Sequence, residues 1–266
     1  MAGKLERTAI ALRRLNVAET MPQAPDARAL LLVALACLGF MLSVPLADVA
    51  SLILYAVYPV VLAAWLGVGL TELLRRSWWA LPLAAAVGMF NPMLDTQTAF
   101  TVGTVAVSRG WVSFVSILVR ALVAVQVVVL LLTAHGFNGL CSALRSIGLP
   151  AFLTTQLAFV YRYITVLLQE ALDMRRAREA RSYGRPALPL RQWGAFIGQL
   201  FIRSVARAER IHKAMLARGF TGVMPSWHPA RRHWTLRDTL FVAVWTLLFA
   251  LLRFLPVPSL LSRLLT

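Results

Sequence analysis

Long apolar segments alternate with short polar ones along most of this chain. Segments of about 20 apolar residues have the length that a helix needs to cross a bilayer. Such segments occupy 29–46, 49–70, 111–133 and 236–254. A shorter one, at 78–90, starts with two tryptophans, which are typical of membrane interfaces, while 93–108 fits no regular pattern. We therefore predict an all-α, polytopic integral membrane protein with about five transmembrane helices.

The composition supports this prediction, because hydrophobic residues make up 59% of the chain and charged residues only 14%. Ordinary soluble domains contain about 25% charged residues, so a soluble globule is excluded. We predict an N-terminal cytoplasmic segment at 1–26, transmembrane helices 1–4 at 27–136, and a cytoplasmic region at 137–234, of which 150–168 is partly membrane-associated. The last transmembrane helix and a tail follow at 235–266.

The cytoplasmic region is expected to contain two long helices. The first starts at Pro150 and stays helical in pattern for more than thirty residues, apolar to about Leu168 and strongly charged afterwards. The second covers 190–218, and Gly219 is expected to end it in the left-handed conformation. Its apolar positions follow a 3.6-residue period, with Arg203, Arg207 and Arg210 on the other face. They are Trp193, Phe196, Ile197, Leu200, Phe201, Val205, Ala208, Ile211 and Met215.

Positive charge is concentrated in this same region. The whole chain has a net charge of +16. The segment from Arg162 to Arg237 contains fifteen basic and four acidic residues. The positive-inside rule places such a region in the cytoplasm. Helices that lie on an anionic membrane surface are an alternative reading of the charge. Nucleic acid is not an expected partner, because the region contains no recognised binding module.

One arginine, Arg120, falls within the predicted span 111–133. A charged side chain at that depth costs several kcal/mol in lipid, so Arg120 is expected to face protein, water or a partner. Alternatively, Arg120 lies nearer the interface and extends its guanidinium towards water.

The ends of the two cytoplasmic helices repeat a short pattern at a distance of 37 residues. Residues 177–184 and 214–222 both contain Ala-x-x-Ala-Arg, then a small residue, an aromatic residue and a glycine. The motifs are Ala180-Arg181-Ser182 and Ala217-Arg218-Gly219. The planar guanidinium of arginine suits a carboxylate. Alternatively, each arginine merely complements the dipole of its own helix.

With these motifs the chain resembles the T subunit of energy-coupling-factor (ECF) transporters, in particular the CbiQ family of the cobalt/nickel branch. The likeness covers about 29–254; its other parts are Asn91-Pro92, Arg109-Gly110 before Arg120, the stretch 144–150, and Tyr161-Arg162-Tyr163. In that family two coupling helices end in Ala-Arg-Gly motifs, from which the first motif here departs with Ser182.

The resemblance implies a non-catalytic coupling subunit of an ATP-driven uptake system. Its expected partners are two ABC-type ATPase subunits, a substrate-binding membrane subunit and membrane lipid, and its expected cargo is cobalt or nickel. The implied ATPase-docking residues are Ala180, Arg181, Ser182, Ala217, Arg218 and Gly219. The implied location is the inner (plasma) membrane of a prokaryote, with multiple spans and cytoplasmic coupling helices.

No enzymatic site or cofactor is expected in this chain itself. Its two lysines, Lys4 and Lys213, lie outside any Walker A pattern, so ATP and magnesium are expected on the partner ATPases. Cys37 and Cys141 are expected to be buried thiols. The histidines show no metal-ligand spacing; they are His135, His212, His228 and His233. A membrane enzyme built on Asp95 and His135, a self-sufficient carrier and a membrane scaffold or regulatory protein remain the alternatives.

Overall fold

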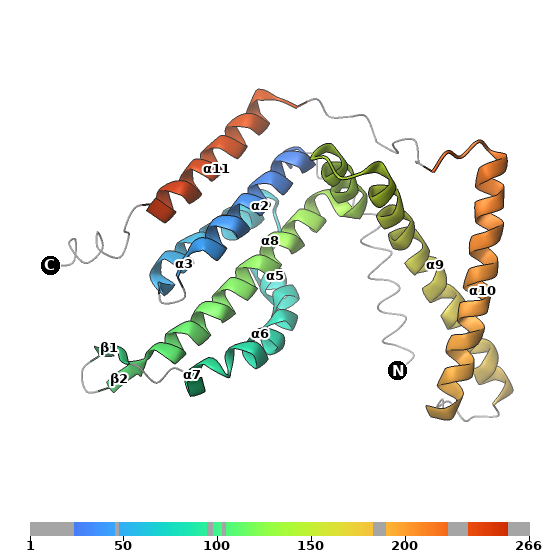
Figure 1. The fold of residues 1–266 in the computed structure, drawn as a ribbon, viewed down its shortest axis with the longest axis horizontal. Helices are drawn as coiled ribbons and strands as arrows, with labels where there is room; N and C mark the ends of the chain where they lie inside the picture. The colour runs from blue at the N-terminus through green and yellow to red at the C-terminus, as the bar shows by residue number, and fades with distance from the viewer. Residues whose placement is uncertain are drawn as a thin grey trace. The chain divides into compact units, whose positions relative to one another are not determined.

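The chain is described here by a computed structural model that covers residues 24–45, 48–94, 98–102, 105–182, 190–222 and 234–254 (Figure 1). The elements in chain order are α2 (Ala27–Ser43), α3 (Val49–Tyr55), α4 (Val57–Trp65), α5 (Leu70–Ser77), η1 (Trp78–Ala80), α6 (Leu81–Gly88), α7 (Asn91–Leu94), β1 (Thr98–Val102), β2 (Val105–Ser108), α8 (Arg109–Ser146), α9 (Ala151–Arg181), α10 (Leu190–Ala217) and α11 (Leu236–Phe254).

Helices make up nearly all of the described residues, which confirms the predicted all-α class. One antiparallel hairpin, β1–β2, is added to the helices between α7 and α8, in the stretch that the sequence pattern left unassigned (Figure 1). Val102 pairs with Val105, and Thr98 pairs with Ser108.

The described residues form two compact units. The first, the α2–α11 unit, contains 24–140 and 234–254, and the second, the α9–α10 unit, contains 141–222. The two units are defined by contacts within the chain and not by the position of a membrane. The predicted boundaries at 26, 136 and 234 concern membrane placement, so they stay predictions.

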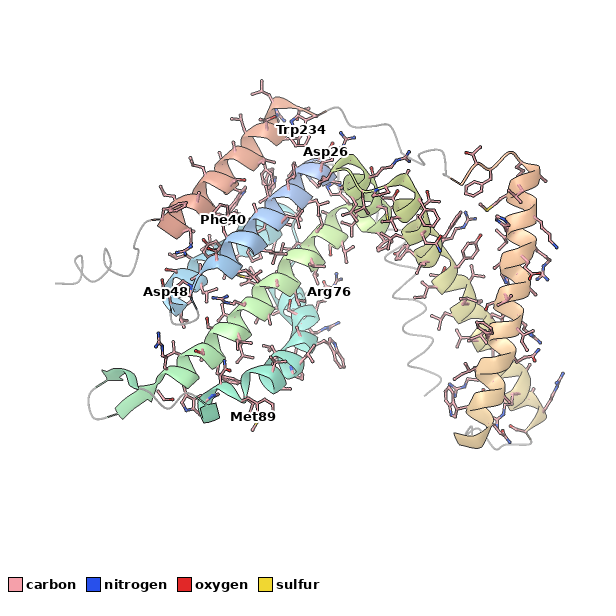
Figure 2. All side chains as sticks on the ribbon, in the orientation of Figure 1. Asp26, Phe40, Asp48, Arg76, Met89 and Trp234 are labelled. Atoms are coloured by element: carbon pink, nitrogen blue, oxygen red, sulfur yellow. The ribbon has the colours of Figure 1, made fainter. Side chains whose placement is uncertain are left out.

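In the α2–α11 unit, α2 and α11 run parallel, because both pairs of ends are linked. At the start, the backbone N–H of Asp26 donates to the buried carboxylate of Asp238 over 3.0 Å. At the end, Arg253 Nε donates to Ser43 Oγ over 3.1 Å. Figure 2 shows Asp26 and Trp234 at one end of this pair and Asp48 at the other. If the number of spans is odd, the first and the last span must run in the same direction, as α2 and α11 do.

An aromatic cluster fixes α3 and α4 against α11. The rings of Tyr55 and Phe249 stack with centroids 5.7 Å apart, and the ring of Tyr58 meets Trp245 at 4.8 Å. Tyr55, Tyr58 and Phe249 are almost completely buried. The Tyr55 hydroxyl also donates to the carbonyl oxygen of Phe249 over 3.2 Å. This cluster therefore belongs to the buried core of the unit.

Helix α8 contains a break at Gly136, where the backbone has φ 64° and ψ −179°. The left-handed φ favours glycine. The break separates the long apolar part of α8 from its last turns, residues 137–146. Within the long part, Arg120 Nη2 donates to the carbonyl oxygen of Val44, the C-cap of α2. Arg120 thus contacts protein, one of the three expected surroundings, which were protein, water or a partner.

Two helices of the described chain, α8 and α9, are long and apolar enough to cross a membrane, and Ala27–Ser43 and Ser51–Trp65 are shorter apolar helices. The predicted second span is divided at Ala56 into α3 and α4, and the third consists of η1 and α6, with α7 beginning at Asn91. Asn91-Pro92 thus lies at the start of a new helix, after the end of α6 at Gly88.

Candidate partner-docking site

The candidate site lies at the ends of α9 and α10, so it depends on how these two helices form. Helix α9 is continuous over 31 residues, as its unbroken helical pattern predicts, with Pro150 as its N-cap. At its start the hydroxyls of Thr154 and Thr155 donate to the carbonyl oxygen of Ala151 over 3.0 and 2.8 Å. Such bonds satisfy hydroxyls in apolar surroundings. α10 extends over 28 residues.

The two helices lie side by side in opposite directions (Figure 1). Arg178, near the end of α9, donates to the Gln192 side chain at the start of α10 over 2.7 Å. In the middle, Glu170 pairs with Arg203 and Arg207. Phe159, in the first half of α9, meets Phe220 just beyond α10, with ring centroids 6.4 Å apart. An antiparallel pair places the two Ala-Arg motifs at opposite ends.

In the first motif, the position that corresponds to Gly219 is Ser182, whose backbone is not left-handed. Ser182 is the C-cap with φ −93° and ψ 8°, and its N–H donates to the Glu179 carbonyl oxygen over 3.2 Å. Its hydroxyl donates to the same oxygen over 3.0 Å. The Glu179 carbonyl oxygen, one of those that have no partner within the helix, therefore accepts two hydrogen bonds from Ser182. Arg181 occupies the last turn of the helix and is exposed.

The second motif ends α10 in a different way. Gly219 has φ 78°, the N–H of Phe220 donates to the Met215 carbonyl oxygen over 3.0 Å, and the N–H of Gly219 donates to Leu216 over 2.9 Å. This pair of bonds is a Schellman motif. The left-handed Gly219 that the sequence predicted is confirmed. Ala217, Arg218 and Gly219 are all exposed.

Both motif arginines are available to a partner. Among the described residues, neither the Arg181 nor the Arg218 side chain takes part in a hydrogen bond or ion pair. By contrast, Arg175 is held by Glu179 on its own helix over 2.7 Å. A free, exposed guanidinium beside a small alanine can approach a carboxylate closely and bind it with two parallel hydrogen bonds. Ala180 lies exposed beside Arg181, as Ala217 does beside Arg218.

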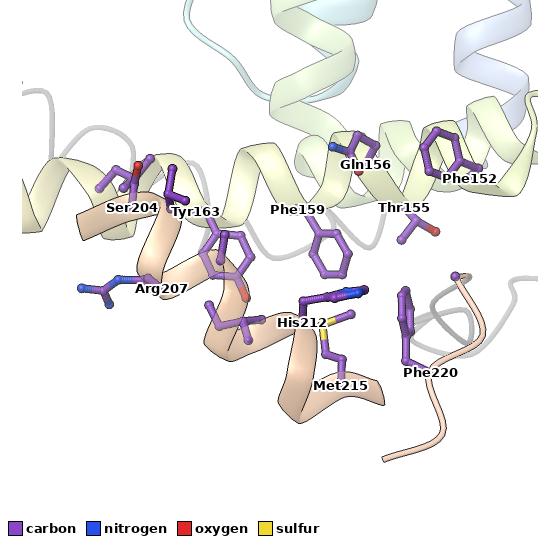
Figure 3. A pocket seen from close by; sticks show the side chains of 15 residues that line it. Phe152, Thr155, Gln156, Phe159, Tyr163, Ser204, Arg207, His212, Met215 and Phe220 are labelled. Atoms are coloured by element: carbon purple, nitrogen blue, oxygen red, sulfur yellow. The ribbon is translucent and has the colours of Figure 1, made fainter. Parts of the chain in front are cut away.

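A groove of about 660 Å³ lies between α9 and α10 (Figure 3). Its walls are mainly aromatic and aliphatic, with Phe152, Phe159 and Tyr163 from α9 facing Met215 of α10 and Phe220. Phe220 and Met215 are the two residues joined by the longer hydrogen-bonded loop of the Schellman motif, so their side chains pack the second motif against α9. Sequence reasoning missed this groove, although Phe220 was part of the repeated pattern.

The apolar residues of α10 are divided between two environments. Phe196, Leu200, Ile211 and Met215 are half-buried, whereas Trp193, Ile197, Phe201 and Val205 are exposed. The predicted arginine face is divided as well: Arg210 is exposed, but Arg203 and Arg207 reach Glu170 on α9. The helix therefore packs along one edge of its apolar stripe and not on the centre of the stripe.

The described residues contain no group of three or more side chains that could hold a metal ion. Cys37 and Cys141 are free and buried, as predicted. His135 Nε2 lies 2.7 Å from the Pro25 carbonyl oxygen. Asp95, His228 and His233 lie outside the described residues, as does the rest of the first repeat beyond Ser182.

Apolar helices of membrane-spanning length, together with a basic antiparallel helix pair, are features of a helical membrane protein. The comparison with protein families gives the same class: the chain belongs to the CbiQ family of cobalt transport proteins, whose family model matches residues 19–228. It is thus a membrane component of the cobalt/nickel transport family, and the predicted relationship is confirmed.

Two curated relatives are similar in sequence. An uncharacterized protein of Methanocaldococcus jannaschii is 27% identical over 215 residues, which cover 77% of this chain and 73% of that protein. The nickel permease LarQ of Lactiplantibacillus plantarum is 34% identical over 115 residues, 42% of this chain and 41% of LarQ. Membership of a transport family supports a permease component and not an enzyme.

Proposed function

We propose that this chain is the transmembrane coupling subunit of an ATP-driven uptake transporter of the energy-coupling-factor type. Arg181 and Arg218 each enter an acidic groove on one of two ABC-type ATPase subunits in the cytoplasm. α9 and α10 transmit the opening and closing of the ATPases to a separate substrate-binding membrane subunit. ATP and magnesium are bound by the ATPases, and this chain remains non-catalytic in the inner (plasma) membrane of a prokaryote.

The observation that carries the proposal is the pair of exposed motif arginines at opposite ends of one antiparallel helix pair, neither of which has a side-chain partner among the described residues. Two like ends suit two copies of one partner. Similarity to a nickel permease and membership of a cobalt transport family support Co²⁺ or Ni²⁺ as the imported ion.

Charge reversal at the motifs tests the proposal. The chain is expressed with its ATPase subunits and purified, and the number of ATPase copies bound per chain is measured by native mass spectrometry. Arg181→Glu and Arg218→Glu are each expected to lose about one copy, and the double variant to lose both. Arg210→Glu is the matched control, because Arg210 is also an exposed arginine of α10 but lies outside the motif. It should retain both copies.

Folding is checked by the elution volume of each variant in detergent. A double variant that elutes like the wild type and still binds two ATPases would overturn the docking role of the arginines. A non-transporting membrane scaffold or regulatory protein would then be the better description. Co²⁺ and Ni²⁺ uptake by cells that express the whole transporter distinguishes the two cargoes.

A further inference from the structure

One acidic residue links the two helices at the middle of their length. The Glu170 carboxylate of α9 is shared by two arginines of α10: Arg203 Nη1 lies 3.2 Å from Oε1, and Arg207 Nη2 contacts Oε2. The Glu170 side chain is only 21% exposed. The other acids of α9 in ion pairs bind arginines of their own helix, Glu179 with Arg175 and Asp173 with Arg176. We call Glu170, Arg203 and Arg207 the crossing cluster.

Two members of the crossing cluster, Glu170 and Arg207, lie at equivalent positions of the internal repeat. Glu170 and Arg207 are 37 residues apart, which is also the distance between Arg181 and Arg218. Each member of the pair therefore precedes the motif arginine of its own helix by 11 residues. At 1.5 Å per residue, each motif lies about 16 Å along its helix from the cluster. The distance from the Glu170–Arg207 pair to the motif arginine is therefore the same along both helices.

Two copies of one helix that cross in opposite directions bring equivalent residues together at the crossing point. Identical charged residues there would repel each other. In this chain the repeated position is glutamate in α9 and arginine in α10. The two equivalent residues therefore attract each other. A partly exposed ion pair adds little to stability, but hydrogen bonds between guanidinium and carboxylate are directional. The cluster is therefore suited to fixing the crossing point.

We infer that Glu170 is a positioning residue for coupling: the crossing cluster holds the two helices at one fixed point, so that the motif arginines move together when the ATPases open and close. This inference rests on the proposed function, in which Arg181 and Arg218 are the docking residues. Glu170 itself binds no ATPase and acts through the two arginines of α10.

A distance measurement on the full chain tests the crossing point without any ATPase. Spin labels are attached at Ala177→Cys and Ala214→Cys, which are exposed, equivalent in the repeat and four residues before each motif arginine. The buried native cysteines, Cys37 and Cys141, are first replaced by alanine. Glu170→Arg places three arginines together, and Glu170→Gln removes the charge with little change of volume.

We expect both Glu170 variants to broaden the distance distribution at least twofold. Glu170→Arg combined with Arg207→Glu restores an opposite-charge pair and should return the distribution towards that of the wild type. Glu179→Arg is the matched control, since Glu179 pairs within α9, and should leave the distribution unchanged. Unchanged distributions in both Glu170 variants would overturn the fixed crossing point.

A second measurement addresses coupling in the complete transporter. With Glu170→Arg we expect ATPase binding to stay within twofold of the wild type, whereas ATP-driven Co²⁺ or Ni²⁺ uptake should be at least tenfold lower. Glu170→Arg combined with Arg207→Glu should recover uptake. Full uptake by Glu170→Arg would overturn the positioning role. If instead the Arg181 and Arg218 variants keep their ATPases, the proposed function fails, and the spin-label distances still decide whether the cluster fixes the helices.

Discussion

Gly219 ends α10 with φ 78°, a backbone angle at which residues with a Cβ are strained. Gly219→Ala should therefore cost about 1 kcal/mol locally. No atom lies within 4 Å of an added Cβ, so the cost comes from the backbone and not from a clash. The capping bonds donated by Gly219 and Phe220 should open roughly fivefold more often. Amide hydrogen exchange of these residues measures the effect.

Gly198→Ala provides the control for this change. Gly198 lies in the interior of the same helix, also with no atom within 4 Å of an added Cβ. There alanine favours the helix by up to about 1 kcal/mol, so exchange should slow or stay the same. Equal exchange in the two alanine variants would contradict the argument from backbone strain.

The two motif ends also show how far residue-level prediction reaches. Glycine after a helical pattern predicts a left-handed end, and Gly219 has one. Serine gives no such signal, because its side chain can satisfy the helix end in several ways. The bond from the Ser182 hydroxyl to the Glu179 carbonyl oxygen was therefore visible only in the structure.

At the level of helices, Phe249 joins α11 to α3 and α4. It is 1% exposed, and its ring lies within 6 Å of the rings of Tyr55, Tyr58 and Trp245. Phe249→Ala should leave a cavity among these rings and cost about 3 kcal/mol. Leu247→Ala, on the same helix but at a residue that is 71% exposed, should change stability by less than about 0.5 kcal/mol.

Denaturant titration in detergent, followed by tryptophan fluorescence, measures both free energies of unfolding. Similar midpoints for the Phe249 and Leu247 variants would show that the ring cluster does not hold α11 in place.

Helix existence was predictable here, but the contact face was not. The 3.6-residue period predicted α10 as a helix, and the predicted Arg203 and Arg207 face turned out to meet α9. When the apolar stripe of a helix is wider than the area that one neighbouring helix covers, that neighbour can pack against it at several angles. The interaction that decides the contact face is the pairing of Glu170 with Arg203. Glu170 lies 33 residues before Arg203, so no local sequence pattern indicates this pairing. The groove between the helices follows from that packing and was equally hidden.

The whole chain has a charge asymmetry that predicts its orientation in the membrane. The α9–α10 unit and its flanking residues contain most of the net positive charge, and positively charged segments remain on the cytoplasmic side. We therefore expect the parallel α2 and α11 both to start inside and end outside. The Ala177 and Ala214 positions should therefore face the cytoplasm, and Pro45, exposed after α2, should face the exterior.

Single cysteines at these three positions, in a chain with Cys37 and Cys141 replaced by alanine, test the orientation with a membrane-impermeant maleimide. Ala177→Cys and Ala214→Cys should react at least tenfold faster in inside-out vesicles, and Pro45→Cys should react faster in right-side-out vesicles. Because Pro45 serves as the opposite-side control, leaky vesicles would reveal themselves by labelling all three positions. A clean reversal would place the motif arginines away from cytoplasmic ATP, and no ATPase of the cytoplasm could then dock on Arg181 and Arg218.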